Sequence, residues 1–171
     1  MKEQFEQIIA QHNGILYKIG RTYTNNASDF DDLYQDMLVQ IWQALPSFKQ
    51  ASKLSTWLYR VCLNTALLYQ RHDKKQVKRN ANQELLSQLP DESDQSLQQA
   101  HARESKIELL YTCIYQLPRL DRAIILLHLE KKKYEEIAHI VGLEANHIGV
   151  KLLRIKKALK QELIKRSYEQ L

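Results

Sequence analysis

Glycine, proline and cysteine are scarce in this chain: its 171 residues include only four Gly, three Pro and two Cys. Because helix breakers are so few, the composition favours helices over β structure throughout. No apolar run approaches the ~20 residues that a membrane span requires, and the N-terminus lacks a signal-peptide pattern. We therefore expect an all-α, cytoplasmic protein without membrane insertion, long enough for one ordinary domain or two small ones.

The residue patterns of catalytic and metal sites are also missing. Cys62 and Cys113 lie far apart, and neither has a second Cys or a His at zinc-ligand spacing. We expect both to be buried thiols in a reducing compartment. The six His are scattered, and His139 and His147 have no third ligand at metal spacing. Without a phosphate-binding glycine loop, a nucleophile elbow or a paired-carboxylate site, we expect no catalysis, no metal and no cofactor.

Charge is distributed unevenly along the chain, whose formal net charge is +5. Residues 71–79 hold five basic residues against one acid, a net +4, and residues 151–166 hold seven against one, a net +6. Residues 84–104 between them have a net charge of −4, from five acids and one Arg. Two basic clusters with an acidic spacer indicate two separate contacts with nucleic acid. A solvated charge run is the alternative for either cluster taken alone.

Residues 134–160 have the pattern of a helix-turn-helix that ends in a basic helix. Gly142 stands where a left-handed residue ends the first helix, and Leu143 is placed to fill the angle between the two helices. The second helix has a narrow apolar stripe made of Ile148, Leu152, Ile155 and Leu159. Its opposite face favours contact with DNA and carries Asn146, Val150, Leu153, Arg154 and Lys157. An ordinary helical hairpin with a solvated basic face is the alternative.

Three helices are predicted in the N-terminal part. The first covers about residues 2–23, and the second begins at Ser28 or Asp29, whose side chains can cap it, and ends at Pro46. The apolar stripe of the second helix is Tyr34, Met37, Leu38, Ile41, Trp42 and Leu45. Capping and an exposed protein-binding face explain its acids better than a metal site does; these acids are Asp29, Asp31, Asp32 and Asp36. The apolar face of the third helix comprises Leu54, Trp57, Leu58, Val61, Cys62, Thr65 and Leu68.

The third helix also has a polar strip suited to single-stranded nucleic acid. Arg60, Asn64 and Arg71 line up on one face, beside Trp57 and near Tyr59. Guanidinium groups can hold phosphates, and flat rings can replace the stacking that an unpaired base loses. The alternative is that Trp57 belongs to the core while Arg60 and Asn64 are merely solvated.

A polar segment separates the two basic clusters. In residues 80–99, ten of twenty residues are Asn, Gln or Ser, which is a linker composition. Helicity resumes near Glu104, and Pro118 is placed to be the first residue of a further short helix. We therefore expect two small helical domains, residues 1–79 and 104–171, joined by a flexible polar linker, residues 80–103. The second domain would contain the helix-turn-helix.

Three motifs in this order resemble the extracytoplasmic-function sigma factors of bacterial RNA polymerase, which belong to the sigma-70 family. The segment from Asp32 to Trp42 is similar to the family's core-polymerase-binding helix. The segment from Ser55 to Asn64 is similar to the helix that helps to open promoter DNA, and the segment from Leu117 to Leu163 to the C-terminal DNA-binding domain. The resemblance covers nearly the whole chain. It implies a factor that binds core RNA polymerase and directs initiation at promoters with minus-ten and minus-thirty-five elements.

The resemblance also assigns roles to individual residues. The residues it implies for core polymerase binding are Asp32, Leu33, Gln35, Asp36 and Trp42. The loop from Phe48 to Leu54 corresponds to the loop that holds a flipped base. With the polar strip, the residues expected at the minus-ten element are Phe48, Lys49, Ser52, Lys53, Trp57, Tyr59, Arg60, Asn64 and Arg71. Those expected at the minus-thirty-five element are Asn146, His147, Gly149, Val150, Lys151, Leu153, Arg154 and Lys157. The resemblance further implies an anti-sigma factor as a candidate partner.

The chain departs from the family pattern at three places. Gly149 stands where a basic or polar residue is common, Glu144 where Ser or Thr caps the helix, and the lysine run 131–133 where a Gly is usual. Val150 and Leu153 can contact thymine methyls but cannot hydrogen-bond to guanine. Two other classes of protein remain as alternatives: a helix-turn-helix regulator that acts without polymerase, and a helical adaptor with incidental basic faces.

Overall fold

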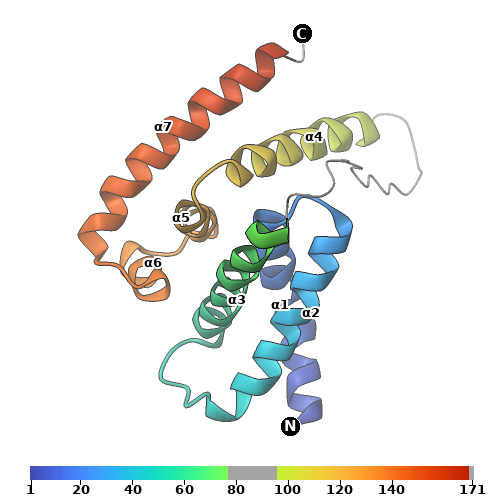
Figure 1. Cartoon of the computed structure of the whole chain (residues 1–171), viewed down its shortest axis with the longest axis vertical. Coiled ribbons are helices and arrows are strands. Elements are labelled where there is room, and N and C mark those ends of the chain that lie inside the picture. Colours follow the sequence, from blue (N-terminus) through green and yellow to red (C-terminus); the bar gives the residue numbers. More distant parts are fainter. Residues whose placement is uncertain (77–95, 170–171) are drawn as a thin grey trace.

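The computed structural model describes the backbone of residues 1–76 and 96–169, and the side chains of residues 1–69 and 103–168. All the regular structure in these parts is helical (Figure 1). The N-terminal domain consists of α1 (Lys2–Tyr23), α2 (Ala27–Ala44), the short 3-10 helix η1 (Leu45–Ser47) and α3 (Leu54–Gln76). The C-terminal domain consists of α4 (Ser96–Tyr115), α5 (Arg119–Leu129), α6 (Tyr134–Val141) and α7 (Ala145–Glu169). The predicted all-α class with two helical domains is confirmed.

The helices α1, α2 and α3 pack on one another around an apolar core. The fully buried side chains at its centre are Leu16, Ile19, Leu33, Met37, Ile41 and Leu58. The start of α2 differs from the prediction, because the side chain of Asn26, not that of Ser28 or Asp29, accepts the Asp29 N–H at 2.8 Å. Asn26 has the extended backbone of an N-cap residue, whereas Asp29 already lies inside the first turn. The helix ends just before Pro46, as predicted.

The turn between α6 and α7 is the one that the sequence predicts. Gly142 has φ +74°, a left-handed conformation that glycine adopts without steric cost, and its N–H donates to the Ala138 carbonyl at 2.9 Å. The predicted stripe of α7 is buried throughout: Ile148, Leu152, Ile155 and Leu159. Pro118 is the N-cap of α5 and not its first residue. The helix-turn-helix is therefore anchored to the domain by the apolar face predicted for it.

The start of α4 differs from the expected domain boundary. The helix begins at Ser96, so residues 96–103 of the expected linker are helical, and helicity resumes eight residues before Glu104. The polar side chains of this segment did not reveal the helix, because apolar periodicity begins only further along the chain. The remainder of the expected linker, up to residue 95, lies outside the described residues.

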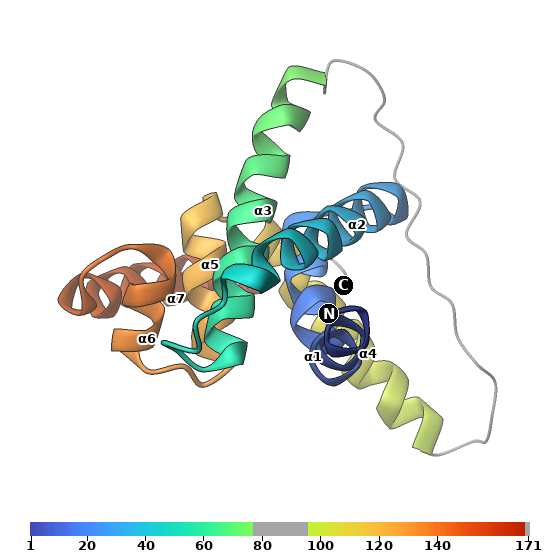
Figure 2. The same ribbon diagram turned by 90° about the horizontal axis from the view of Figure 1, so that it is seen from below.

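The two domains contact each other through α1 and α3. Helix α1 packs against α4 and α5, and α3 lies between α2 and the C-terminal domain, where it meets α6 (Figure 2). The apolar face of α3 differs from the prediction. Leu63, which the prediction did not include, is buried, and Leu68, which it placed on the buried face, is 55% exposed. Helical periodicity predicts a single buried face, but α3 packs against α6 of the C-terminal domain as well as against α1 and α2.

Candidate functional site

The outer face of α2 displays most of the residues expected to bind polymerase. Asp32, Gln35 and Asp36 are exposed, and Trp42 is 36% exposed with its ring edge-on to that of Phe5, the two centroids 5.1 Å apart. Val39, which the sequence analysis did not select, is half exposed on the same face, three residues beyond Asp36. Val39 is an apolar residue outside the predicted apolar stripe of α2, and this mismatch could have identified it as an exposed apolar residue.

Leu33 is a correction to the expected polymerase surface. Its side chain is fully buried in the core of the N-terminal domain, together with Met37 and Ile41 at four-residue intervals. A partner can therefore not reach it without disrupting the helix packing. Leu33 fixes α2 on the bundle and so orients the acids that precede and follow it.

The loop between η1 and α3 is folded back onto α3. The rings of Phe48 and Trp57 lie 4.9 Å apart between centroids and are tilted by 37°. Lys49 and Lys53, in the same loop, are exposed, and Ser52 is half-buried. The arrangement places two flat rings and two cations at one end of the domain. Cations of this kind can hold phosphates, and the rings can stack on bases.

Arg60 and Asn64 are exposed one turn apart on the outer face of α3, as predicted. Because neither side chain contributes to the core, both are free to contact a ligand. The third member of the predicted strip, Arg71, lies on the last turns of α3, beyond the described side chains.

Tyr59, expected at the minus-ten element, is buried in this arrangement and only 3% exposed. Its hydroxyl donates to Oε2 of Glu130 in the C-terminal domain at 3.1 Å. Burial, followed by the negative charge of Glu130, raises the pKa of Tyr59 above its usual value. The prediction that this ring is available to bases is therefore wrong for this arrangement, in which the two domains are in contact. Tyr59 lies on the side of α3 that meets the C-terminal domain, and the sequence alone did not reveal that contact.

The outer face of α7 lies opposite the buried stripe and is open to a partner. Its exposed residues among those predicted are Asn146, His147, Val150, Leu153, Arg154 and Lys157. Val150 and Leu153 are 52% and 73% exposed, so a partner can reach both apolar side chains. Gly149 is half-buried beside Tyr134, since a Cβ atom there would be 3.5 Å from Cε2 of the tyrosine ring.

Lys151, another residue of this predicted set, forms an ion pair with a different helix of the chain. Its Nζ lies 3.3 Å from Oδ1 of Asp121 on α5, and its side chain is 37% exposed. The ion pair connects the start of α7 to α5. Lys151 therefore helps to orient α7, and its charge is partly neutralised before any DNA approaches.

Comparison with known proteins agrees with this geometry. Residues 8–76 match the family Sigma-70 region 2, and residues 107–159 match Sigma-70, region 4. The chain belongs to the sigma-70 family. It is an extracytoplasmic-function sigma factor, and its function is to direct the initiation of transcription at promoters.

Relatives and solved structures of similar sequence or fold cover nearly the whole sigma factor. RNA polymerase sigma factor SigV of Bacillus subtilis is 25% identical over 158 residues, which are 92% of this chain and 89% of that protein. RNA polymerase sigma factor YlaC of the same organism is 28% identical over 150 residues, 86% and 84% of the two chains. The sigma factor RpoE of Bartonella quintana, solved with the anti-sigma factor NepR, has the same fold, with a TM-score of 0.69 at 23% identity over 95% of this chain and 98% of that one.

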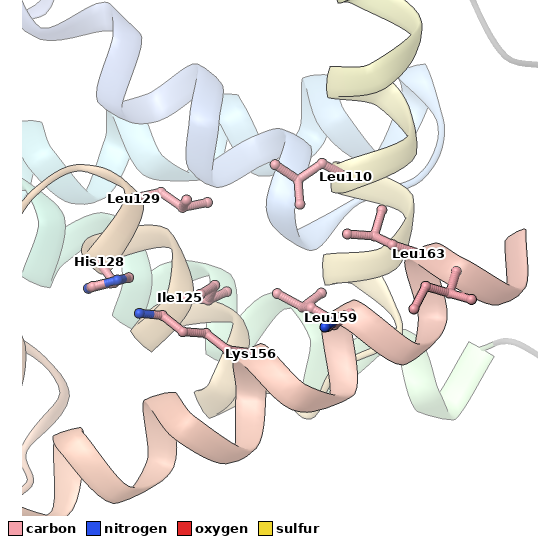
Figure 3. Close-up of a pocket in the computed structure, with 9 residues that line it drawn as sticks. Leu110, Ile125, His128, Leu129, Lys156, Leu159 and Leu163 are labelled. Carbon is pink, nitrogen blue, oxygen red and sulfur yellow. The ribbon is translucent and has the colours of Figure 1, made fainter. Parts of the chain in front are cut away.

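An apolar groove on the C-terminal domain of the sigma factor was not predicted from the sequence. It has a volume of about 360 Å³ and lies between α4, α5 and α7 (Figure 3). Leucine and isoleucine side chains line most of it, together with His128, Lys156 and Lys160. Burial, and secondly the charge of Lys156, lower the pKa of His128. Because the lining comes from three helices, the periodicity of any one helix could not reveal the groove.

Two classes of site are absent from the described parts of the chain. Among the residues that the structure describes, no group of three or more His, Cys, Asp or Glu side chains could hold a metal ion. None of the described helices is both long enough and apolar enough to cross a membrane.

Proposed function

We propose that this sigma factor binds core RNA polymerase through the outer face of α2 and reads promoter DNA with two separate surfaces. The minus-ten surface comprises the loop that follows η1 and the outer face of α3, and the minus-thirty-five surface is the outer face of α7. The observation that carries the proposal is that these three faces display predicted contact residues while their opposite faces are buried. A side chain in this position can bind a partner without loss of core packing.

At the minus-thirty-five element, α7 would enter the major groove with its N-terminal turns. Arg154 and Lys157 supply cations for phosphates, which give affinity without sequence choice. Val150 and Leu153 supply apolar contacts that fit thymine methyl groups, so we propose that this helix favours thymine at the positions they touch. Asn146 and His147 add hydrogen-bonding side chains at the start of the helix.

At the minus-ten element, the exposed strip on α3 would follow the separated strand. Arg60 and Asn64 can hold its backbone and base edges, and the Phe48–Trp57 pair offers a stacking surface between Lys49 and Lys53. Tyr59 can join this surface only if the C-terminal domain moves away from α3.

Several further properties follow from the same proposal. We infer that the sigma factor acts without catalysing a reaction and without a metal or cofactor, since binding surfaces account for the residues singled out. Its place of action would be the cytoplasm, where bacterial RNA polymerase works. An anti-sigma factor is a further proposed partner, supported by the structural neighbour that was solved with one.

Polymerase binding distinguishes this function from that of a regulator that binds DNA alone. Asp36→Arg reverses an exposed charge on α2, and we expect it to weaken co-elution with purified core RNA polymerase and reduce promoter-dependent transcription. Glu104→Arg makes the same charge change at an exposed position of α4 and is the matched control. The proposal requires that the unmodified chain itself binds core polymerase. A chain that binds promoter duplex but not polymerase would instead be the regulator, and equal polymerase binding by Asp36→Arg would remove α2 from the interface.

A further inference from the structure

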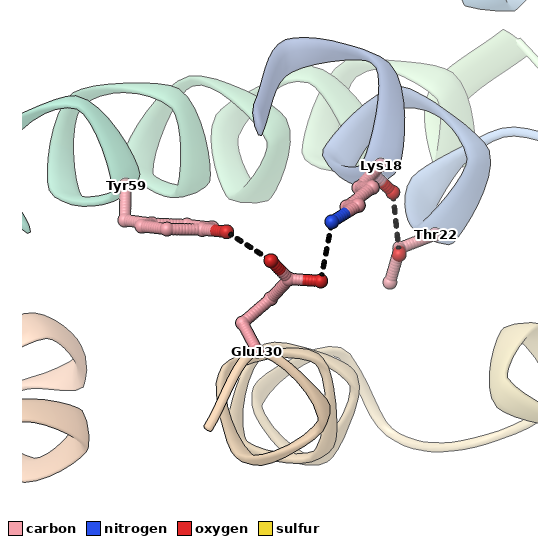
Figure 4. A network of polar contacts seen from close by, with 4 residues as sticks. All are labelled: Lys18, Thr22, Tyr59 and Glu130. Carbon is pink, nitrogen blue, oxygen red and sulfur yellow. Dashed lines mark hydrogen bonds and ion pairs between the residues drawn. The ribbon is translucent and has the colours of Figure 1, made fainter. Parts of the chain in front are cut away.

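Two of the aromatic side chains that the sequence analysis expected at partner surfaces are fixed in different ways. Tyr59 is buried and bonded to Glu130, which also pairs with Lys18 (Figure 4). Trp42 is 36% exposed, and its ring lies against that of Phe5 on α1. Phe5 is not among the residues expected to bind polymerase, but it touches one of them.

The course of the two N-terminal helices explains how Phe5 reaches Trp42. Helices α1 and α2 run antiparallel to each other (Figure 1). Three contacts mark this course, at Gly20–Phe30, Asn13–Tyr34 and Phe5–Trp42. The residue numbers fall along α1 as they rise along α2. The first turns of α1 therefore lie beside the last turns of α2, where the exposed face of α2 ends.

The proposed polymerase surface changes its character along α2. Asp32 and Asp36 give its first part an acidic face, whereas the exposed Val39 and Trp42 make its last part apolar. Tryptophan is enriched among the side chains that contribute most to protein interfaces. An exposed side chain that can rotate loses this freedom when a partner binds it, and that loss weakens binding. A ring that is already fixed in the free protein avoids this cost.

The geometry of the Phe5–Trp42 pair is suited to fixing the indole. The ring centroids lie 5.1 Å apart and the planes are at 89°, the edge-to-face arrangement that the charge distribution of aromatic rings favours. Such a contact restricts both the position and the tilt of the exposed ring. Because Trp42 is at the edge of the bundle, the pair holds it while part of its surface stays open to a partner.

Phe5 is itself anchored to the core of the N-terminal domain. Its side chain is half-buried and packs against the core, on the same face of α1 as the buried Ile8. Its N–H donates to the Met1 carbonyl at 3.0 Å, which closes the first turn of the helix. The N-cap residue is Met1, whose side chain cannot cap a helix, so packing has to hold this turn. Phe5 thus connects the core to Trp42.

We propose that Phe5 is a positioning residue for polymerase binding, which holds the Trp42 ring in its binding orientation without contacting polymerase itself. The effect on affinity rests on the proposed function of the α2 surface, but the orientation of Trp42 in the free sigma factor does not. The polymerase-binding site then includes the first turn of α1 in addition to α2. Loss of the Phe5 ring lowers the affinity for core RNA polymerase only through Trp42.

The orientation of Trp42 can be measured in the free protein. The chain has two tryptophans, Trp42 and Trp57, so labelling with fluorotryptophan gives two fluorine NMR resonances, which Trp42→Phe assigns. Phe5→Leu keeps an apolar side chain for the core but removes the ring. It should shift the Trp42 resonance and leave that of Trp57 in place, whereas Phe5→Tyr should keep both at the positions of the parent. An unchanged Trp42 resonance in Phe5→Leu would overturn the proposal.

Affinity for purified core RNA polymerase connects this orientation to function. Phe5→Leu in the full chain should bind about 2–10-fold more weakly than the parent, the range that an aromatic pair of this kind accounts for. Phe5→Tyr retains the ring and should bind as the parent does. Gln4→Ala, at an exposed position in the same turn of α1, is the matched control and should also bind normally. Far-UV circular dichroism should be the same for all these proteins.

A double-mutant cycle separates positioning from direct contact and from loss of structure. In a Trp42→Ala background, Phe5→Leu should cause no further loss of polymerase affinity, because the ring that it positions is gone. An equal loss in both backgrounds would overturn the positioning role. If Trp42→Ala binds like the parent while Asp36→Arg binds weakly, the α2 surface stands and the role of Phe5 is overturned. If neither variant is impaired, the proposed α2 surface itself fails, whatever the resonances show.

Discussion

The ring of Phe30 lies directly against the backbone of Gly20, where an added Cβ atom would be 2.5 Å from Cε2 and 2.8 Å from Cδ2. Among the four glycines, Gly20 is the one at which an added Cβ atom would lie closest to a neighbouring side chain. The Phe30 ring is stacked on Tyr34, with centroids 6.1 Å apart, and its other neighbour is the ring of Tyr17 at 5.4 Å. Because two rings confine it, Phe30 has little room to yield to a larger residue at position 20.

Gly20→Ala should therefore destabilise the protein by about 1–3 kcal/mol through overpacking, although alanine favours a helix. Gly14→Ala in the same helix is the matched control, because nothing lies within 4 Å of its added Cβ, and it should stabilise by ~0.5–1 kcal/mol. Urea unfolding followed by circular dichroism measures both changes. Stabilisation by both substitutions would show that Phe30 moves aside at no cost.

The outer strip of α3 should act in promoter opening and not in duplex binding. Both Arg60 and Asn64 are exposed, so the double variant Arg60→Ala/Asn64→Ala should fold normally and form closed complexes with polymerase on duplex promoter DNA. The permanganate reactivity of minus-ten thymines should fall, since the separated strand loses its contacts. Reactivity equal to that of the parent would mean that this strip is only a solvated face.

The basic side chains of α7 should divide into phosphate and base contacts. Lys157→Ala should weaken binding evenly across sequences and reduce the salt slope by about one unit. Arg154→Ala should in addition cost ~1–3 kcal/mol on the preferred site, because a guanidinium can bond to paired base acceptors. Salt-dependent binding and promoter-selection sequencing measure these effects, with Lys106→Ala on α4 as the exposed control. Full minus-thirty-five-dependent transcription by both α7 variants would exclude this helix from DNA reading.

The thiol of Cys62 should make stability depend on pH in the alkaline range. Burial raises its pKa from 9.0 to about 12, so the folded protein retains a proton that the unfolded chain loses. This contribution to stability is fully present below pH 9 and is lost as the pH rises toward 12. Between these values the free energy of unfolding should fall by at most about 1.4 kcal/mol per pH unit more in the parent than in Cys62→Ala. Equal pH slopes for the two proteins would show that the thiol ionises while buried. The buried tyrosines are common to both and do not affect the difference.

The helix-turn-helix could be predicted from the sequence because its determinants are local. The left-handed turn at Gly142 requires a particular residue type, and the stripe from Ile148 to Leu159 follows from the helical period. The residues on the outer face of α7 could then be predicted by exclusion, since residues opposite a buried stripe point to solvent. Asp32 and Asp36 were likewise expected on an exposed acidic face of α2, and Gln35 was selected from the family resemblance; all three are exposed.

Residues that lie near a second surface could not be placed in this way. Leu33 was assigned to an interface because a motif contains it, but the core of the N-terminal domain buries it completely. The groove on the C-terminal domain combines side chains from three helices, and the helical residues 96–103 were hidden by their polar composition.

The sequence by itself determined that the chain is helical, where its main turn lies, and which residues share a face of each helix. Only the tertiary structure decided which faces are covered, because burial depends on the helices that lie opposite and these come from distant parts of the chain. Tyr59 shares α3 with the exposed Arg60, yet the C-terminal domain buries Tyr59 and pairs it with Glu130, 71 residues away. A helical period fixes the angle between neighbouring side chains, but the assembled domains determine which of them reach solvent.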